Sequence, residues 1–334
     1  MKNITIADVA KHAKVSKSTV SQFLNKRFDY MSEKTKKKIE ETIKELNYQP
    51  NIVARSLKQK ATFTVGVVVA NILHTFSTQI IRAMEDAFHE QGYQIIVCNA
   101  DDEPEKEKKY IEMLLAKQVD GIMIFPTGCN LDLYERMKRQ QFPVVFIDRT
   151  IKDLNIATVM LDNQMAAKLA VSQFVKNGRK RIALITTSII RNISPRVERL
   201  EGFKNALADH GLPVNKAYLK SASADQLPAV LEEMFNLPAP PDALLAGNDI
   251  VLYEVLRFMK KRNLTIPGDA AVIGIDDVPF ASFFTPPIST VAQPVAEMAE
   301  KAVELLLFQI KNKEDREFED IFRYKPSLIE RDSD

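Results

Sequence analysis

The chain of 334 residues has few cysteines and no long apolar segment. No run of about 18 apolar residues occurs, so we expect no membrane-spanning helix, and the first residues lack the apolar core of a secretion signal. The two cysteines, Cys98 and Cys129, do not have the spacing of metal ligands. Because cysteines this sparse are typical of the reducing cytoplasm, and each lies in or beside an apolar run, we predict a cytoplasmic protein with two buried free thiols.

The motifs of common enzyme classes are also missing. The sequence contains no G-x-G-x-x-G after a strand, no phosphate-binding P-loop, no G-x-S-x-G nucleophile turn and no cluster of metal ligands. Of four histidines, His74 alone lies in a segment expected to end a strand, where it is interpreted as a ligand contact or a solvated side chain. We therefore predict that the protein is not an enzyme and holds no cofactor or metal.

The charge distribution divides the chain. Residues 1–60 carry 14 lysines and arginines against 6 aspartates and glutamates, a net charge of +8, whereas the remaining residues carry 32 against 38, a net charge of −6. A basic head on an acidic body is typical of a polyanion-binding module joined to another domain. A secreted solute-binding protein would account for the body but not for this head. The alternative for the lysine-rich run 34–44 is an ordinary solvated helix.

The head has the pattern of two short helices joined by a tight turn. Thr5 followed by Asp8 predicts a capping box on the first helix, and Ser16 predicts the cap of a second helix. A third helix is expected over residues 33–46, with Ser32 as its cap. The second helix would enter the major groove and read base edges. Its outward side chains are Lys17, Ser18, Ser21 and Gln22.

A further short helix pattern covers residues 51–57, just before the rhythm of the sequence changes. A helix this short is unstable alone, so we expect it to fold only with a partner, such as DNA and the same segment of a second subunit. Leu57 would then wedge into a minor-groove step and kink the duplex. The alternative is that Leu57 packs at the end of a linker. A paired segment and a pseudo-palindromic operator both imply a homodimer.

From residue 61 onward, apolar strand patterns alternate with helix patterns, which predicts parallel sheets covered on both faces. The alternation restarts near residue 181 without an intervening linker. The predicted fold is an α-helical helix-turn-helix DNA-binding head plus an α/β body of two doubly wound lobes that exchange strands. We predict domains over 1–48, 49–60 and 61–334, with lobe 1 over about 61–160 and 292–322 and lobe 2 over about 161–291 and 323–334.

Polar residues follow the expected strands, where ligands bind in sheets of this kind. Their side chains suit charge-assisted hydrogen bonds to hydroxyls and carboxylates. A helix N-cap is the alternative role for one of Asp148, Asn248 and Asp276. For Arg191 and Arg196 the alternative is a solvated surface position. The polar segments are 71–77, 148–149, 186–199, 248–249 and 276–277.

The whole chain resembles the lactose-repressor/galactose-repressor (LacI/GalR) family of transcription regulators. The resemblance is carried by TIADVAKHAKVSKSTVSQFLN, ELNYQPNIVARSL and PSLIERDS, which occur in the order typical of that family. It implies a body like the type I periplasmic binding proteins, with an effector cleft between two lobes. It assigns base reading to Lys17, Ser18 and Gln22, intercalation to Leu57, and effector binding to Arg199 in RLEGF.

Two sets of candidate residues follow from the patterns and the resemblance together. The predicted DNA-binding residues are Thr5, Ser16, Lys17, Ser18, Thr19, Ser21, Gln22, Asn25, Ser32, Asn51, Ala54, Arg55 and Leu57. The predicted effector-binding residues are His74, Phe76, Asp148, Arg149, Arg196, Arg199, Asn248 and Asp276.

Two positions in the head depart from the family pattern. Lys14 stands where the turn usually has glycine; if its φ is positive, lysine there costs about 1 kcal/mol. Gln22 stands where arginine is common. Because arginine favours guanine and glutamine favours adenine, we predict an operator that differs from the family's commonest one at the contacted base pair.

The effector is predicted from the arginines. Residues 220–225 carry no aromatic ring, where the family often has one stacked on a sugar or base. Arg149, Arg191, Arg196 and Arg199 lie in the cleft segments, and arginine suits bidentate carboxylate binding. We therefore expect a sugar acid, and the chain is similar to the 2-keto-3-deoxygluconate-responsive repressors of the family. The alternative is a co-repressor-dependent regulator of carbon or purine metabolism.

Overall fold

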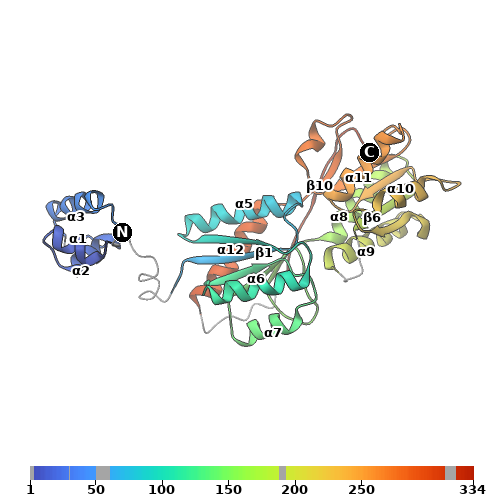
Figure 1. The fold of residues 1–334 in the computed structure, drawn as a ribbon. Coiled ribbons are helices and arrows are strands. Elements are labelled where there is room, and N and C mark those ends of the chain that lie inside the picture. Colours follow the sequence, from blue (N-terminus) through green and yellow to red (C-terminus); the bar gives the residue numbers. More distant parts are fainter. Residues whose placement is uncertain (1–3, 30, 50–60, 188–192, 313–320) are drawn as a thin grey trace. The chain divides into compact units, whose positions relative to one another are not determined.

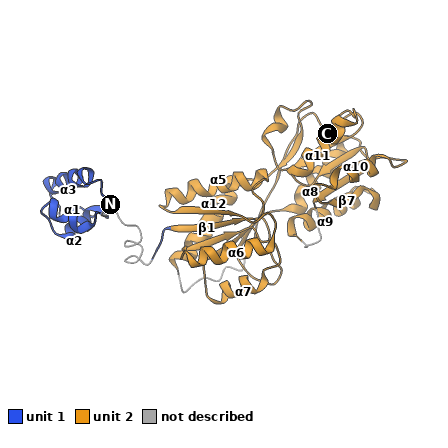
Figure 2. Ribbon diagram, in the orientation of Figure 1, with its two compact units in different colours: residues 1–63 blue, residues 64–334 orange. Residues whose placement is uncertain are grey.

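The computed structural model describes residues 4–29, 31–49, 61–187, 193–312 and 321–334. The chain forms two compact units, residues 1–63 and residues 64–334 (Figure 2). The segment predicted to form the hinge helix, residues 51–57, lies outside the described residues.

The described part of the smaller unit contains three helices, α1 (Ile6–His12), α2 (Lys17–Leu24) and α3 (Glu33–Glu45) (Figure 1). Their predicted caps are confirmed. The Asp8 carboxylate accepts hydrogen bonds from the Thr5 backbone amide at 2.9 Å and from the Thr5 hydroxyl at 2.7 Å. Ser16 and Ser32 each accept a hydrogen bond from the amide three residues on, at 3.1 and 3.2 Å. These bonds satisfy amides that a helix leaves open in its first turn.

The turn between α1 and α2 holds Lys14 in the left-handed region, with φ of 51°. The φ of Lys14 is therefore positive, as the predicted strain at this residue requires, because a side chain at positive φ crowds the backbone. The helices close over a small apolar core that includes Val9, Val20 and Ile39, each fully buried.

The larger unit is built on two six-stranded sheets. The first has the strand order β11-β5-β4-β3-β1-β2, with every pair parallel. Figure 1 shows α5 and α12 on one face of this sheet and α6 and α7 on the other. Its strands are β1 (Thr64–Val69), β2 (Gln94–Asn99), β3 (Gly121–Ile124), β4 (Val144–Ile147), β5 (Thr158–Leu161) and β11 (Ile321–Tyr324). Its helices are α5 (Thr75–Glu90), α6 (Pro104–Ala116), α7 (Leu131–Arg139) and α12 (Val295–Lys311).

The second sheet has the strand order β12-β10-β9-β8-β6-β7, with only β12 antiparallel among the described strands. Its strands are β6 (Ile182–Thr187), β7 (Leu219–Ala222), β8 (Ala243–Ala246), β9 (Ala271–Ile275), β10 (Ser289–Ala292) and β12 (Ser327–Ile329). Its helices are α8 (Asn163–Lys176), α9 (Ser194–Asp209), α10 (Leu227–Phe235) and α11 (Asp249–Lys261), and two 3-10 turns cover Lys216–Tyr218 and Pro279–Ser282.

Successive residues of the central strands alternate between the two faces of the second sheet, as the period of a strand requires. Ile182 and Leu184 pack with α8 and α9, whereas Ala183 and Ile185 pack with α10 and α11. Because both faces are covered, these strands are apolar throughout.

The chain crosses between the two sheets after Leu161, after Ala292 and after Tyr324. The first two crossings lie close to the expected positions near 160 and 290. The expected boundary between 322 and 323 is wrong, because it falls inside β11, which pairs with β5 of the first sheet through Tyr324.

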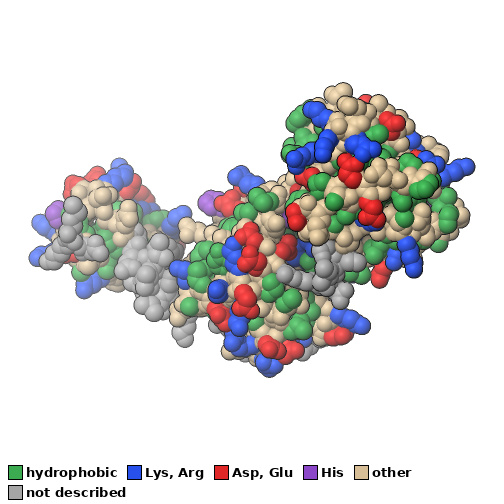
Figure 3. Space-filling view, turned by 45° about the vertical axis from the view of Figure 1, so that its right-hand side comes forward, with side chains coloured by type: hydrophobic (Ala, Val, Ile, Leu, Met, Phe, Trp, Pro, Cys, Tyr) green, Lys and Arg blue, Asp and Glu red, His purple; other side chains and the backbone are tan. Residues whose placement is uncertain are grey.

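The two cysteines differ in environment. Cys98 lies in β2 and is buried, but Cys129 is exposed, so the prediction of a buried thiol is wrong there. The apolar run of β3 ends at Ile124, and Cys129 follows in a connecting loop. Among the described residues, no helix has both the length and the apolar character needed to cross a membrane. On the face of the larger unit drawn in Figure 3, acidic and basic side chains are interspersed.

Candidate functional site

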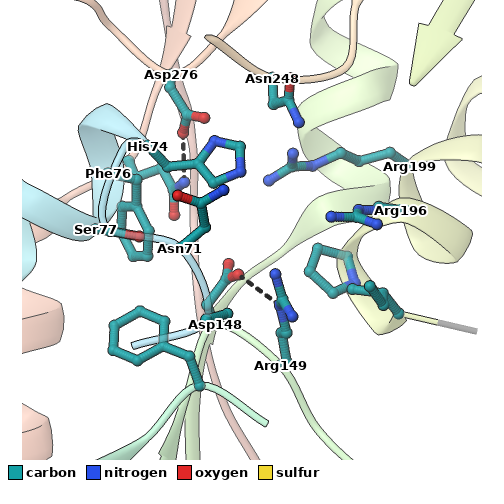
Figure 4. A pocket seen from close by; sticks show the side chains of 15 residues that line it. Asn71, His74, Phe76, Ser77, Asp148, Arg149, Arg196, Arg199, Asn248 and Asp276 are labelled. Carbon is teal, nitrogen blue, oxygen red and sulfur yellow. Dashed lines mark hydrogen bonds and ion pairs between the residues drawn. The ribbon is translucent and has the colours of Figure 1, made fainter. Parts of the chain in front are cut away.

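A pocket lies between the two α/β lobes, beside the carboxyl ends of β1, β4, β8 and β9 (Figure 4). Counted together with the open solvent at its mouth, its space amounts to about 490 Å³. The structure brings together at this pocket all eight residues predicted to bind an effector. They are His74, Phe76, Asp148, Arg149, Arg196, Arg199, Asn248 and Asp276.

One side of the pocket, here called the arginine end, is formed by Arg149 and Arg196. Arg149 follows β4, and its Nη1 donates a hydrogen bond to Asp102 Oδ1 at 2.7 Å. Its buried Nε makes no hydrogen bond within the described residues and lies 3.8 Å from Asp148 Oδ2. Arg196 extends from α9 of the other lobe, and its Nη2 lies 3.7 Å from Asp102 Oδ2. The arginine end is thus assembled from both lobes.

The surface alternative for Arg196 is wrong, since its side chain is only 13% exposed. Burial lowers the pKa of Arg196, the positive charge of Arg149 lowers it further, and the result is a pKa of about 10. The guanidinium remains charged at neutral pH. Arg191, the other arginine considered as a surface residue, lies outside the described residues.

A second side of the pocket, the carboxylate end, is formed by Asp276 with Gln293. Asp276 follows β9 with φ of 81°, and its Oδ1 accepts a hydrogen bond from Gln293 Nε2 at 2.6 Å. Burial raises the pKa of Asp276 above its ordinary value, and the charges of Asp249 and Asp148 add to this effect, although Arg199 opposes it. Asp276 and Arg149 enter the pocket from opposite sides in Figure 4.

Arg199 and Asn248 lie between these two ends. Arg199 is buried on α9, where its Nε donates to Asn163 Oδ1 at 2.8 Å and its Nη1 donates to the Gly247 carbonyl at 2.6 Å. These bonds hold the guanidinium toward the pocket. Asn248 caps α11 by accepting a hydrogen bond from the Val251 amide at 2.9 Å. The N-cap alternative therefore holds for Asn248, which has this structural role as well as a position in the lining.

His74 links the lobes at the edge of the pocket. Its Nδ1 lies 2.6 Å from Oδ1 of Asp249, the first residue of α11. The other Asp249 oxygen accepts a hydrogen bond from the Thr75 amide at 2.6 Å, at the start of α5. Burial raises the pKa of Asp249, but the hydrogen bond and charge of His74, with the Thr75 amide, outweigh it and leave the pKa below its ordinary value. A lobe 2 carboxylate thus caps a lobe 1 helix.

Several residues at or beside the pocket were not among the predicted ones, including Asn71, Asp249, Asp102 and Gln293. Asn71 and Asp249 lie in polar segments that had been marked at strand ends, so a signal for them existed. Asp102 and Gln293 lie outside the polar segments expected after strands, so no sequence pattern indicated them. Only the tertiary structure places Asp102 against the two arginines and Gln293 against Asp276.

In the smaller unit, α2 presents the residues predicted to read bases. Lys17, Ser18 and Gln22 are exposed. The Ser18 hydroxyl lies 2.6 Å from the hydroxyl of the cap residue Ser16, and the Thr19 hydroxyl lies 2.8 Å from it. Lys17 and Gln22 have no such local bond among the described interactions, so their side chains are the more available for base edges.

Ser21 is half-buried on α2, and the other predicted DNA-binding residues fall into two groups. Thr5, Ser16 and Ser32 act as helix caps, and Asn25 Nδ2 donates to the Ser21 carbonyl at 2.8 Å. These four side chains therefore have local structural roles. Asn51, Ala54, Arg55 and Leu57 lie outside the described residues. Where the structure describes the chain, no three His, Cys, Asp or Glu side chains are grouped so as to hold a metal ion.

Comparison with known proteins agrees with this architecture. Residues 5–51 match the model for bacterial regulatory proteins of the lacI family, and residues 171–333 match the periplasmic binding protein-like domain. The chain is 47% identical to the probable HTH-type transcriptional regulator EndR of Paenibacillus polymyxa, over 98% of each chain. The chain belongs to the lacI family of bacterial regulatory proteins. It is also 35% identical to the HTH-type transcriptional regulator KdgR of Bacillus subtilis, over 92% of this chain and 91% of that one.

Solved structures of this family show the same fold. The lac repressor dimer bound to operator and an anti-inducer is 25% identical, with 99% of each chain covered and a TM-score of 0.85. The complex of the regulator CelR with cellobiose is also 25% identical, with 99% of this chain and 100% of that one covered and a TM-score of 0.74. The two-lobed body and helix-turn-helix head are therefore those of lacI-family regulators.

Proposed function

We propose that the protein is a homodimeric repressor that binds a pseudo-palindromic operator in the cytoplasm and is controlled by a sugar-derived effector in the interlobe pocket. The observation that carries this proposal is the pocket, in which arginines and carboxylates from both lobes converge on one space. Lys17, Ser18 and Gln22 would contact base edges in the major groove, and Leu57 would intercalate in the minor groove.

The effector that best fits the pocket is a sugar acid, such as 2-keto-3-deoxygluconate. At the arginine end, the positive charges of Arg149 and Arg196, both of which line the pocket, favour a carboxylate. At the carboxylate end, Asp276 would accept hydrogen bonds from hydroxyl groups. A ligand with a carboxylate at one end and hydroxyls at the other matches both ends. The cluster of arginines alone would be a weaker argument, because Asp102 balances part of its charge.

The dimer would use exposed apolar side chains near the interlobe seam. Asp249 contacts the start of α5, and Tyr253 lies one turn further along the same face of α11. Tyr253 is 58% exposed, and Leu73, which precedes the contacted residues, is 78% exposed. Large apolar side chains this exposed favour a protein contact, and the related lac repressor structure is a dimer on its operator.

The effector would act by preferring one arrangement of the lobes. If that arrangement separates the two 51–57 segments, they lose their contacts and operator affinity falls. A coupling of about 1–3 kcal/mol would change operator affinity roughly 5- to 150-fold. The sign of the change distinguishes an inducer from a co-repressor.

The test combines a thermal-shift screen with operator titrations. Sugar acids, sugar phosphates, neutral sugars and purines are screened first, since a ligand at 100 times its Kd adds about 2.7 kcal/mol of stability. We expect Arg199→Ala to retain operator binding but lose the response to the hit. Arg257→Ala, which changes a 69% exposed arginine, is the matched control and should respond normally. A normal response in Arg199→Ala would contradict the pocket assignment.

A further inference from the structure

The turn after β2 carries two adjacent aspartates, Asp101 and Asp102, both in the left-handed region with φ of 52° and 57°. They face different partners. Asp101 lies against Lys106 and accepts a hydrogen bond from Asn99 Nδ2 at 2.6 Å. Asp102 bonds Arg149 at 2.7 Å and lies 3.7 Å from Arg196 of the other lobe. One carboxylate therefore faces a surface lysine, and its neighbour faces both arginines of the arginine end.

Asp102 supplies a negative charge to the two arginines of the arginine end without lining the pocket. It is absent from the residues that line the pocket, whereas Arg149 and Arg196 both line it. Burial raises the pKa of Asp102, but Arg149 and then Arg196 outweigh burial and hold the pKa below its ordinary value, so the carboxylate is charged at neutral pH. A ligand carboxylate bound at the arginine end would therefore lie near the negative charge of Asp102.

The arginine end nevertheless keeps an unused donor. Arg149 lines the pocket and is 5% exposed; its Nε–H is buried, makes no hydrogen bond among the described residues and lies 3.8 Å from Asp148 Oδ2. A buried donor left unpaired costs free energy, which a ligand oxygen would recover. This donor and the positive charges of Arg149 and Arg196 strengthen the binding of an acidic ligand, whereas repulsion by Asp102 weakens it. A neutral ligand gains from the donor without that repulsion.

We propose that Asp102 determines the selectivity of this pocket between acidic and neutral ligands by supplying the counter-charge to Arg149 and Arg196. This inference rests on the proposed effector site. Removing the charge leaves a buried arginine pair undercompensated, and an acidic ligand then replaces the missing charge. The affinity for acids relative to neutral sugars should rise at least about 10-fold, because like charges within a few ångströms in a partly buried site interact strongly.

The experiment compares Asp102→Asn with Asp101→Asn in the full-length protein. Both remove one negative charge from the same turn, and asparagine tolerates the left-handed conformation of both positions. Calorimetric titrations use D-gluconate and D-glucuronate as acids, D-glucose and D-glucitol as neutral ligands, and inorganic phosphate as a probe without a sugar. Asp102→Gly, which also suits positive φ, is the second variant if Asp102→Asn folds poorly.

We expect the ratio of acid to neutral affinity to rise at least about 10-fold in Asp102→Asn and to change less than about 3-fold in Asp101→Asn. An unchanged or lower ratio in Asp102→Asn, or an equal rise in both variants, would overturn the inference. If no sugar binds the wild-type protein, the proposed ligand class fails. Tighter phosphate binding in Asp102→Asn alone would then still support the role of Asp102, and equal phosphate binding in both variants would refute it.

Discussion

The clearest physical conflict in the pocket is the buried carboxylate of Asp276, and it predicts that Asp276→Asn stabilises the protein while impairing its response. Asp276 is 6% exposed, and its pKa is raised chiefly by burial. The raised pKa already includes the attraction of Arg199, so the folded state favours the neutral form of this side chain more than the unfolded state does. Asparagine mimics that form and tolerates the φ of 81°.

The neighbouring amide favours the substitution as well. Gln293 donates to Asp276 Oδ1, and its own Oε1 is buried without a hydrogen-bond partner among the described residues. The amide of an asparagine at position 276 could donate to this oxygen, which would satisfy a group that is now unpaired. We expect the free energy of unfolding at pH 7 to increase, and the Tm to rise with it by about 2–4 °C for each kcal/mol in a domain of this size.

The pH dependence has a definite sign. Because the folded pKa of Asp276 exceeds the unfolded one, the native state holds the proton more tightly, and stability falls as pH rises from the ordinary carboxyl pKa to the raised one. The stability gain of Asp276→Asn should therefore be absent below about pH 4 and reach its full size above the raised pKa. Thermal and urea denaturation between pH 3.5 and pH 8, without ligand, measure this difference.

Asp277→Asn is the matched control, one residue away. Asp277 accepts hydrogen bonds from Arg331 Nη2 at 2.8 Å and from the Thr290 hydroxyl at 2.6 Å. Loss of its charge should lower stability by about 1–2 kcal/mol, the opposite sign. The reasoning about burial at Asp276 would be refuted if Asp276→Asn were less stable than the wild type at pH 7. Operator titrations should show a weakened effector response for Asp276→Asn only.

Three further predictions concern the head and the interlobe link. Lys14→Gly should stabilise the head by about 1 kcal/mol and raise its Tm in calorimetry, because Lys14 has a φ of 51°. The control, Asn47→Gly, should give a smaller gain because asparagine tolerates its φ of 45°. Equal gains would contradict strain at Lys14. Gln22→Arg should shift the preferred base from adenine to guanine at one operator position by about 1–3 kcal/mol, and an unchanged selected operator would place Gln22 away from the bases. Asp249→Asn should cost about 1.5–3 kcal/mol by weakening the bond to His74. This loss should shrink as the pH falls below the ordinary carboxyl pKa and disappear only below the depressed pKa of Asp249; urea titrations from pH 7 downward measure it, and a loss that did not change with pH would contradict the prediction.

Much of the fold could be predicted locally. Thr5 with Asp8, Ser16 and Ser32 mark helix starts because a short polar side chain can satisfy the open amides of its own helix. The apolar runs predict strands over 144–147, 243–246 and 271–275, and β4, β8 and β9 have these bounds, since a continuous apolar run between polar residues leaves little choice. The polar residues at strand ends likewise indicated the position of the pocket.

Other features depend on partners distant in the sequence. The helical pattern of the sequence predicts the first helix of lobe 1 over 78–90, but α5 begins at Thr75, because its open amide is satisfied by Asp249 of the other lobe. Nothing near Thr75 in the sequence supplies that oxygen. The burial of Arg196 was not predictable from the sequence either, because an arginine in a polar segment is usually solvated and only the closely placed lobes bury this one.

The sequence by itself determined the family, the basic head, the helix caps, the alternation of strands and helices, and the candidate residues of the pocket. Each of these depends on neighbours along the chain, at periods of two to four residues. Only the tertiary structure decided that Asp102 balances two arginines, that Gln293 contacts Asp276, and that Asp249 joins the lobes. Charges and hydrogen bonds act over a few ångströms of space, and the fold brings together residues that lie up to 175 positions apart in the chain.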